Sequence, residues 1–352
     1  MAPAKTQKRG LMERLNAGET VIIAEGYMFE LERRGYLAGG CNVPEVVLEH
    51  PEVLRQLTEE FVHAGTDVVL AMMYYGQRQK LRALGREAEY EELNLRALAI
   101  AREIADKHGL LWAGNICNST TYDPTNPATI KECQETFKEQ VEWSVNAGAD
   151  YLVAETFFDA GEAVLATEAA KKYGKGLPVV VTIGTWADKT VDDYSLLEAC
   201  LAVEKAGADV VGLNCGAGPT LMTQRIKHIK QHIKVPVACS PVLYRTTKED
   251  FNFMKIRCPN GERAYFADLD AYMVSQSEVG EFGRAMAQLG VQYVGLCCGN
   301  SPRYFRRLAE TLGRTPPASR YNTDMTKSFL FADPATITPY QHKARQLVDG
   351  EI

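Results

Sequence analysis

Short runs of apolar, often β-branched residues alternate along this chain with longer segments of helical periodicity. Eight such runs predict strands, over residues 21–25, 67–72, 110–116, 150–155, 179–183, 209–214, 235–239 and 293–297. Between them, strong helix formers predict helices, for example over residues 89–107, 130–145, 161–173, 195–205 and 280–289. Nearly continuous apolar strands that alternate with amphipathic helices are typical of a parallel sheet covered by helices.

A local repeat precedes four of the predicted strands. Residues 63–67, 146–150, 205–209 and 288–292 each carry a glycine at the third position, where a helix needs a left-handed C-cap before the chain turns into the sheet. Eight strand-and-helix units in about 300 residues predict an α/β fold, a (β/α)8 TIM barrel. A doubly wound open sheet is the alternative, but Glu25-Gly-Tyr-Met-Phe follows the first strand in place of G-x-G-x-x-G.

Two segments depart from the regular alternation. Residues 240–274, after the seventh predicted strand, form a long loop, and such loops are more often functional or mobile than idle. From residue 315 the chain becomes proline-rich and then irregular. We therefore expect a barrel domain over residues 1–314 and a C-terminal extension over residues 315–352, which packs on the outside of the barrel or on a partner subunit.

The amino-acid composition bears on which partners the protein binds and on the cell compartment in which it works. The 352 residues carry a formal net charge of −6, which gives no reason to expect nucleic acid or an anionic membrane as partner. No run approaches the roughly 18 apolar residues of a membrane span, and no signal-peptide core follows the first basic residues. Nine cysteines are then better explained as reduced thiols, some reactive or metal-bound, than as a disulfide framework. We expect a cytoplasmic protein.

Cysteines stand at two of the predicted strand ends. Y-V-G-L-C-C-G-N (residues 293–300) carries Cys297 and Cys298, and V-V-G-L-N-C-G-A-G-P (residues 210–219) carries Cys215. Three thiolates would make a soft ligand set that zinc favours, with one position open for a substrate. Core filling is the alternative for any one cysteine. For the adjacent pair to share a metal the chain must bend, which Gly299 permits, and spacing alone leaves both interpretations open.

Other polar residues are predicted at the same end of the barrel, where TIM-barrel active sites lie. Glu25 ends the first strand, Tyr74 and Tyr75 follow the second, and Glu155 ends the fourth. As alternatives, the glutamates suit helix N-termini and the tyrosines suit packing at the rim. The six histidines fall on predicted helices, at their ends or in the tail, so they are poor candidates for ligands.

From about residue 15 to residue 314 the chain resembles the homocysteine S-methyltransferase family, and its betaine-dependent members most of all. The motifs that carry the resemblance are V-V-G-L-N-C and Y-V-G-L-C-C-G-N-S-P, supported by Glu25-Gly26 with E-L-E-R-R-G-Y, Glu45 with E-H-P-E-V-L-R-Q-L, Tyr74-Tyr75 with K-L, and Ala154-Glu155. The resemblance implies an enzyme that moves a methyl group from an onium donor, betaine or a sulfonium, to the zinc-bound thiolate of homocysteine, giving methionine.

The resemblance also implies roles for single residues. The zinc ligands are Cys215, Cys297 and Cys298, and the implied catalytic residues are Glu25, Tyr75 and Glu155. In this scheme Tyr75 occupies the open metal position until substrate arrives, Glu155 receives the amino group of homocysteine, and Glu25 stands where the family usually has aspartate. The substrate site is expected to be lined by Gly26, Asn42, Tyr74, Glu155 and Phe157.

The chain departs from the family's pattern at the donor site. Asn42 stands where the betaine enzymes place a tryptophan, and aromatic faces are how proteins usually hold quaternary ammonium groups. Candidates to form the cage instead, for betaine, S-methylmethionine or dimethylsulfoniopropionate, are Tyr27, Tyr74, Phe157, Phe158 and Trp186. The family's oligomerisation arm is shortened here, so a dimer and a tetramer both stay open.

Other functions stay open beside this one. One is methyl transfer to a different thiol, or from a corrinoid protein on another chain. A zinc hydrolase is a poor match because such sites usually need histidine and carboxylate ligands. A non-enzymatic zinc or thiol sensor is the remaining alternative.

Overall fold

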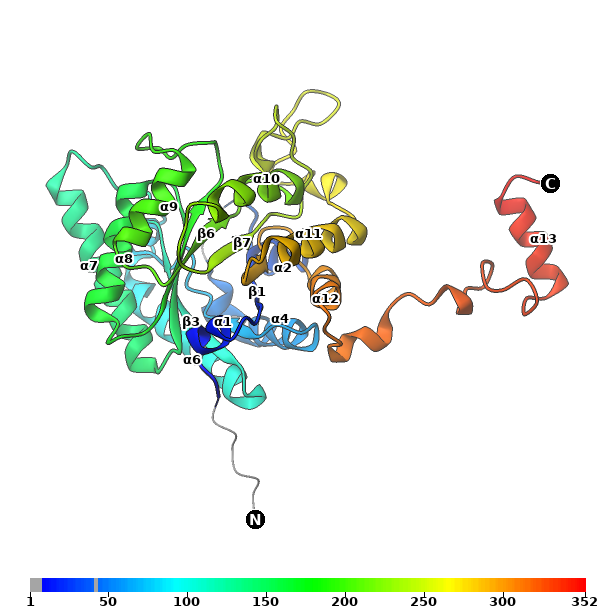
Figure 1. The fold of residues 1–352 in the computed structure, drawn as a ribbon, viewed down its shortest axis with the longest axis horizontal. Helices are drawn as coiled ribbons and strands as arrows, with labels where there is room; N and C mark the ends of the chain where they lie inside the picture. Colours follow the sequence, from blue (N-terminus) through cyan, green and yellow to red (C-terminus); the bar gives the residue numbers. More distant parts are fainter. Residues whose placement is uncertain (1–7, 41–43) are drawn as a thin grey trace, which may run out of the picture.

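A computed structural model describes residues 8–40 and 44–352 of the chain (Figure 1). Eight parallel strands close into one barrel in sequence order. They are β1 (Val21–Ala24), β2 (Val68–Leu70), β3 (Leu111–Cys117), β4 (Tyr151–Phe157), β5 (Val179–Gly184), β6 (Val210–Asn214), β7 (Val237–Ser240) and β8 (Tyr293–Leu296). Each predicted strand overlaps one of these, and β8 pairs with β1 to complete the ring. The predicted TIM barrel is confirmed.

Helices surround the barrel, and most of them connect consecutive strands and cover its outside. They are α1 (Leu11–Asn16), α2 (Tyr27–Arg33), α3 (Val46–Glu49), α4 (Pro51–His63), α5 (Arg78–Ala83), α6 (Tyr90–His108), α7 (Pro127–Ala147), α8 (Ala160–Tyr173), α9 (Leu196–Lys205), α10 (Pro219–Lys230), α11 (Gln276–Leu289) and α12 (Pro302–Thr311), while α13 (Pro339–Val348) lies in the tail. The five helices predicted above correspond to α6, α7, α8, α9 and α11. Among the described residues, no helix is long and apolar enough to cross a membrane.

The four-fold sequence repeat, which precedes β2, β4, β6 and β8, ends helices and begins strands at the N-terminal end of the barrel. Its four glycines, Gly65, Gly148, Gly207 and Gly290, all have positive φ, as predicted for helix C-caps. Three of the repeats end in aspartate, and each aspartate accepts a hydrogen bond from a backbone N–H of the neighbouring strand. The bonds run from Ile22 N to Asp67 (2.7 Å), from Trp112 N to Asp150 (2.8 Å) and from Val179 N to Asp209 (2.8 Å). The repeat therefore fixes where adjacent strands begin.

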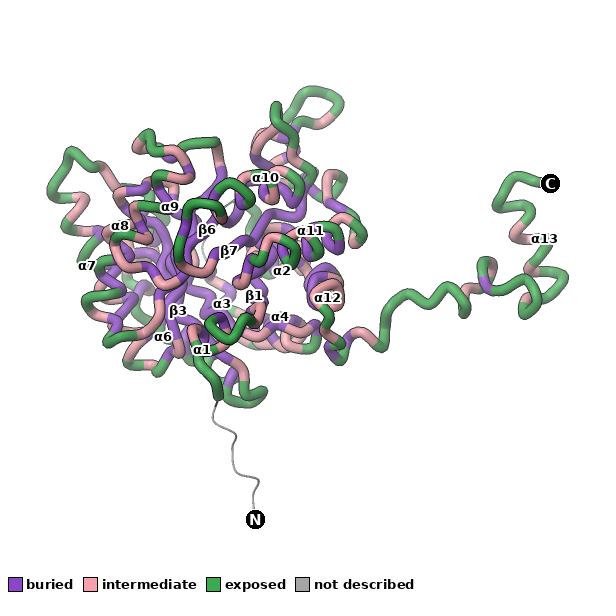
Figure 2. Tube along the Cα trace, viewed as in Figure 1, coloured by how far each residue is buried: buried purple, intermediate pink, exposed green. Residues whose placement is uncertain are grey.

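Apolar side chains form one layer between sheet and helices and another inside the barrel, and a third cluster lies at the loop that follows β7. The strands at the centre of the molecule are buried (Figure 2). The inner layer is closed at the bottom by Leu11 and Leu15 of α1. Tyr151 and Tyr293 also lie in it, and their hydroxyls, 3.0 Å apart, satisfy each other. Because this end is filled, the space for a ligand is at the C-terminal ends of the strands.

The long loop predicted after strand seven is present as residues 241–275. It contains two short 3-10 turns, η2 (Phe253–Lys255) and η3 (Leu269–Tyr272). Helix α2, which follows β1, holds this loop: Phe29 stacks on Phe266 with ring centroids 4.7 Å apart, and Arg33 Nη2 pairs with Asp270 Oδ1 at 2.5 Å. The loop is thus fastened over the C-terminal end of the barrel.

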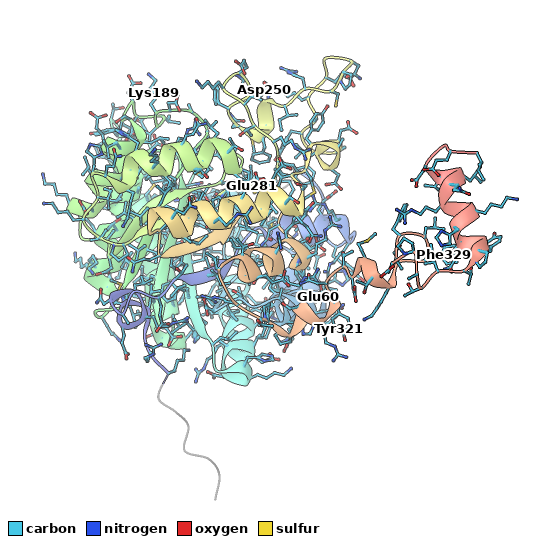
Figure 3. All side chains as sticks on the ribbon, turned by 45° about the vertical axis from the view of Figure 1, so that its right-hand side comes forward. Glu60, Lys189, Asp250, Glu281, Tyr321 and Phe329 are labelled. Atoms are coloured by element: carbon cyan, nitrogen blue, oxygen red, sulfur yellow. The ribbon has the colours of Figure 1, made fainter. Side chains whose placement is uncertain are left out.

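The C-terminal extension packs on the barrel only at its start. The turn η4 (Pro317–Tyr321) lies against α12, where Arg306 donates a 3.2 Å hydrogen bond to the Ala318 carbonyl. Beyond Tyr321, the chain runs away from the barrel and ends in α13, a helix that the sequence pattern did not predict (Figures 1 and 3). We call residues 322–352 the arm. It exposes several large apolar side chains, Met325, Phe329, Phe331, Tyr340, Leu347, Val348 and Ile352.

Candidate active site and metal centre

Three cysteine sulfurs converge at the C-terminal end of the barrel. Cys215 follows β6 directly, and Cys297 and Cys298 follow β8. Backbone hydrogen bonds to the end of β7 hold both segments, from Cys215 N to the Ser240 carbonyl at 2.9 Å and from Cys297 N to the Pro241 carbonyl at 2.8 Å. The Sγ atom of Cys298 lies 3.5 Å from that of Cys215 and 3.9 Å from that of Cys297.

The spacing of these sulfurs fits a metal ion. A zinc–sulfur bond of about 2.3 Å in a tetrahedral site separates two sulfurs by about 3.8 Å. All three sulfurs here lie within 4.8 Å of one another, and no other group of three or more possible ligands is found among the described residues. The donor set is all thiol, which suits a soft divalent ion and leaves a fourth position toward the cavity.

Local backbone features bring the two adjacent cysteines to the same cluster. The predicted bend is made at Gly299, which has φ +86°. Gly26 lies against this bend, since a Cβ on it would be 2.2 Å from the Cys297 carbonyl oxygen. Asn300 donates a 3.1 Å hydrogen bond to the Glu25 carbonyl and so joins the bend to the end of β1.

The three thiols share their protons unequally. Burial raises the pKa of Cys215, but hydrogen bonds from Cys297 and Cys298 outweigh burial and make the net shift downward. The bond to Cys215 raises the pKa of Cys297 and Cys298 well above that of an ordinary thiol. The cluster therefore favours one thiolate shared by two thiols, a buried negative charge that a divalent cation would neutralise while releasing the remaining protons.

Two buried carboxylates face the same space. Glu25 is 4% exposed and Glu155 is 5% exposed. Burial and the neighbouring Cys297 raise the pKa of Glu155 to about 8, although Asn115 and Asn214 donate hydrogen bonds to its oxygens. Burial and the nearby Glu155 raise the pKa of Glu25, whose Oε2 atom has no hydrogen-bond partner among the described residues. Such a pair, without a cation between them, favours the binding of an ammonium group.

Tyr74 and Tyr75 stand beside the thiols. Their rings meet edge to face with centroids 4.4 Å apart, and Asn118 donates a 3.4 Å hydrogen bond to the Tyr74 hydroxyl. Tyr75 has φ +67°, a left-handed conformation that is uncommon for a bulky residue. Burial and the nearby Cys298 and Cys215 raise the pKa of the Tyr75 phenol, so it remains protonated in the metal-free protein.

These groups surround one open-mouthed cavity at the C-terminal end of the barrel. It is lined by Glu25, Gly26, Tyr74, Tyr75, Glu155 and the three cysteines of the cluster, as the sequence predicted. Of the cage candidates, Tyr27 and Trp186 also line it, and Phe158 stacks behind Trp186 at 5.1 Å. Asn42 lies outside the described residues.

Phe157 lies away from the cavity, and unlike Phe158 it does not stack on a lining residue through its ring. Its ring is fully buried between sheet and helices, 6.0 Å from that of Phe137, and does not line the cavity. Simple alternation would place residues 155 and 157 on one face of β4. A bulge lies between Ala154 and Phe157, and Thr156 within it has φ +61°. The bulge shifts the alternation of side chains by one residue, so Phe157 points out of the barrel toward the helices.

Many of the residues that line the cavity were not predicted from the sequence. The unpredicted lining residues include Met28 and Phe29 of α2, Asn115 of β3, and Phe253, Met254 and Tyr265 of the long loop. Asn115 carried a usable signal, because it is a lone amide inside an apolar strand, W-A-G-N-I-C. For the loop residues the only signal was a local excess of aromatic side chains, F-N-F-M and A-Y-F.

Comparisons with known proteins agree with this architecture. A statistical description of the family "Homocysteine S-methyltransferase" matches residues 21–312. The chain is 33% identical to betaine–homocysteine S-methyltransferase 1 of Bos taurus over 89% of this chain and 77% of that protein. It is 31% identical to S-methylmethionine–homocysteine S-methyltransferase BHMT2 of Mus musculus, over 91% of this chain and 87% of that protein.

A solved structure supports the fold. The homocysteine methyltransferase MmuM of Escherichia coli, in its metallated form, superimposes with a TM-score of 0.63 at 18% identity and covers 84% of this chain and 98% of that one. At this identity the likeness concerns the barrel alone. The family match and the curated relatives together cover the barrel and every segment that builds the cavity. The chain therefore belongs to the homocysteine S-methyltransferase family and is a methyltransferase.

Proposed function

We propose that the enzyme uses zinc to transfer a methyl group from a small onium donor, betaine or a sulfonium, to the sulfur of homocysteine, giving methionine. The observation that carries the proposal is the convergence of three thiols and two buried carboxylates on one cavity. Thiols suit a metal that binds sulfur, and the carboxylates suit the ammonium group of an amino acid. Homocysteine carries both partners, a thiol and an ammonium group, on one short chain.

Cys215, Cys297 and Cys298 would hold the ion. A bound zinc ion lowers the pKa of a further thiol ligand, so that this sulfur is a thiolate at neutral pH. Glu155 receives the ammonium group of homocysteine, and Glu25 adds a second negative charge beside it. Asn115 and Asn214 fix the Glu155 carboxylate by hydrogen bonds. We expect Glu155→Gln to weaken homocysteine binding by about tenfold to a hundredfold, because a charged hydrogen bond contributes about 1.5–3 kcal/mol, and to leave zinc binding nearly unchanged.

The mouth of the cavity suits the donor. Its wall carries Tyr75, Trp186, Phe253 and Tyr265, and no lysine, arginine or histidine among the described residues. Aromatic faces attract a quaternary ammonium or sulfonium group.

The transfer itself needs no proton. A bond forms between the homocysteine sulfur and the methyl carbon while the bond from that carbon to the donor's nitrogen or sulfur breaks. The bonding electron pair leaves with the donor, which departs as a neutral amine or thioether. The protein's task is to align the two substrates and exclude water.

A donor screen tests the proposal. Purified, zinc-loaded enzyme is incubated with homocysteine and, separately, with betaine, dimethylsulfoniopropionate, S-methylmethionine and S-adenosylmethionine, and methionine is measured. We expect turnover with at least one of the first three, lost on chelation and regained with added zinc. Turnover with betaine would make Trp186 and the loop aromatics the replacement for the family's tryptophan. No turnover with any donor, with zinc bound, would contradict the proposal and point to another thiol acceptor or a corrinoid protein.

We also propose that the arm, residues 322–352, binds a second copy of this chain and that the enzyme is a cytoplasmic homo-oligomer. Phe329, Tyr340 and Leu347 are 64%, 75% and 66% exposed, which is unfavourable for a free monomer. Removal of the arm, residues 322–352, should convert the oligomer to a monomer in light scattering. A full-length chain that is monomeric at micromolar concentration would contradict this part.

A further inference from the structure

Lys80 is a buried cation behind the candidate active site. It lies on α5 and is 9% exposed. Its ammonium group forms no ion pair with any described residue, and its hydrogen-bond partner is the Cys117 sulfur at 3.9 Å. Burial lowers the pKa of Lys80, and the nearby Cys117, Glu162 and Glu155 oppose this shift. A lysine is rarely buried without a carboxylate in contact, so another interaction must favour this position.

That interaction is with the two site tyrosines. The Lys80 Nζ atom lies 4.5 Å from the ring centroid of Tyr75 and 5.0 Å from that of Tyr74. Both distances fall within the range of cation–π attraction, which strengthens when the cation is removed from water. One ammonium group therefore contacts both rings and joins them to α5.

The backbone beside Tyr75 is held by other residues. Asn94 and Gln140 donate hydrogen bonds to the Gly76 carbonyl at 2.8 and 3.3 Å, and Gln77 donates one to the Cys117 carbonyl at 2.9 Å. These amides would fix the turn whatever residue stood at position 80. What they do not fix is the direction of the Tyr75 ring, which projects from a left-handed residue toward Cys215 and Cys298.

We propose that Lys80 is a positioning residue, whose ammonium group holds the rings of Tyr74 and Tyr75 and so keeps the Tyr75 phenol beside the Cys215 and Cys298 sulfurs. The consequence for catalysis rests on the function proposed above, while the placement of the ring does not. A neutral side chain of similar length would fill the same space without attracting either ring. It would also remove the cost of burying a charge, so the protein should not become less stable.

Lys80→Met, Lys80→Gln and Lys80→Arg test the proposal. The control is Lys138→Met, which removes another cation–π contact, 5.4 Å from the Tyr173 ring and remote from the cavity. Each protein is labelled with 3-fluorotyrosine, the Tyr75 resonance is assigned by its absence in Tyr75→Phe, and zinc content, thermal midpoint and kcat are measured.

We expect the two neutral variants to shift or broaden the Tyr75 fluorine resonance and to lower kcat at least tenfold. Zinc content and thermal midpoint should match those of the wild type, Lys80→Arg should restore both resonance and kcat, and Lys138→Met should change neither. An unchanged Tyr75 resonance with unchanged kcat in the folded neutral variants would overturn the proposal. So would a fall in thermal midpoint with an unchanged resonance, which indicates a purely structural lysine. If the wild type fails to transfer methyl groups, the function proposed above fails, but the fluorine resonance still decides the role of Lys80.

Discussion

The sulfur of Cys215 lies 3.5 Å from the sulfur of Cys298, although 83 positions separate the two residues along the chain. Each follows a strand of the closed barrel, and the strand between them, β7, hydrogen-bonds to both segments. The thiol cluster is thus built on three neighbouring strands, β6, β7 and β8.

Removing one of these sulfurs should separate metal binding from folding. We expect Cys215→Ala to bind zinc at least a hundredfold more weakly and to lose methyl transfer, while the thermal midpoint of the metal-free protein changes little, because Cys215 lies at the edge of the core. Zinc is measured by competition with a chromophoric chelator. Cys258→Ala, a cysteine of the long loop outside the cavity, is the control and should behave as wild type. A Cys215→Ala protein with full activity would refute the assignment.

Glu155 gives the metal-free protein a characteristic dependence on pH. Its pKa is raised from an ordinary glutamate value to about 8, so the folded protein disfavours the charged form. Stability linked to this group is therefore complete below pH about 4.5 and is lost as the pH rises toward 8. We expect Glu155→Gln to become progressively more stable than wild type across this range in urea titrations. A stability difference that does not vary with pH would contradict the burial of an unpaired carboxylate.

Gly26 should be irreplaceable for a steric reason. A Cβ there would lie 2.2 Å from the Cys297 carbonyl oxygen, so Gly26→Ala must displace the bend that carries two of the sulfurs. The control is Gly35→Ala, since Gly35 has the same φ of +79° but nothing within 4 Å of the added Cβ. Both variants pay the strain of a left-handed alanine, about 1–3 kcal/mol. We expect Gly26→Ala to lower zinc affinity and Gly35→Ala to leave it unchanged. An equal fall in zinc affinity in the two variants would exclude the clash as the cause.

The contact of Arg33 with Asp270 should matter for the donor more than for the metal. Arg33 reaches from α2 to the long loop and also donates a 3.2 Å hydrogen bond to the Tyr244 hydroxyl. Because this loop carries Phe253 and Tyr265, Arg33→Met should raise KM for the donor about fivefold, equivalent to about 1 kcal/mol of lost positioning. Zinc affinity should stay the same. Arg55→Met, which breaks a surface pair with Glu103, is the control and should leave KM unchanged.

The barrel and the convergence of the three cysteines were predictable because both follow from local patterns. Apolar runs between amphipathic helices indicate buried parallel strands, and the three cysteines stand directly after two of them. Phe157 was wrongly predicted to line the substrate site, because the bulge at Thr156 shifts the alternation of side chains along β4. Nothing in the local sequence predicts that Thr156 adopts a left-handed conformation. Helix α13 was missed although Thr338 and Gln341 form a capping box, because its short apolar pattern follows an irregular, proline-containing stretch.

Residues that act through tertiary packing were the least predictable. Phe253 and Tyr265 reach the cavity only because the long loop folds back over the barrel and is fastened to α2. Lys80 looks like an ordinary solvated lysine in the sequence, and its contact with both tyrosine rings depends on how α5 packs under the turn after β2. Such relationships have no periodic signature along the chain.

X-ray absorption at the zinc edge tests the central claim most directly. It counts the sulfur atoms around the ion in the zinc-loaded enzyme, with and without saturating homocysteine. Zinc bound by cysteines in proteins usually has four ligands in a tetrahedral arrangement. We therefore expect three cysteine sulfurs and one lighter atom around the ion without homocysteine, and four sulfurs with it. A count that stays at three after homocysteine is added, or that begins below three, would contradict the proposal that this cluster holds the ion and presents it to the substrate thiol.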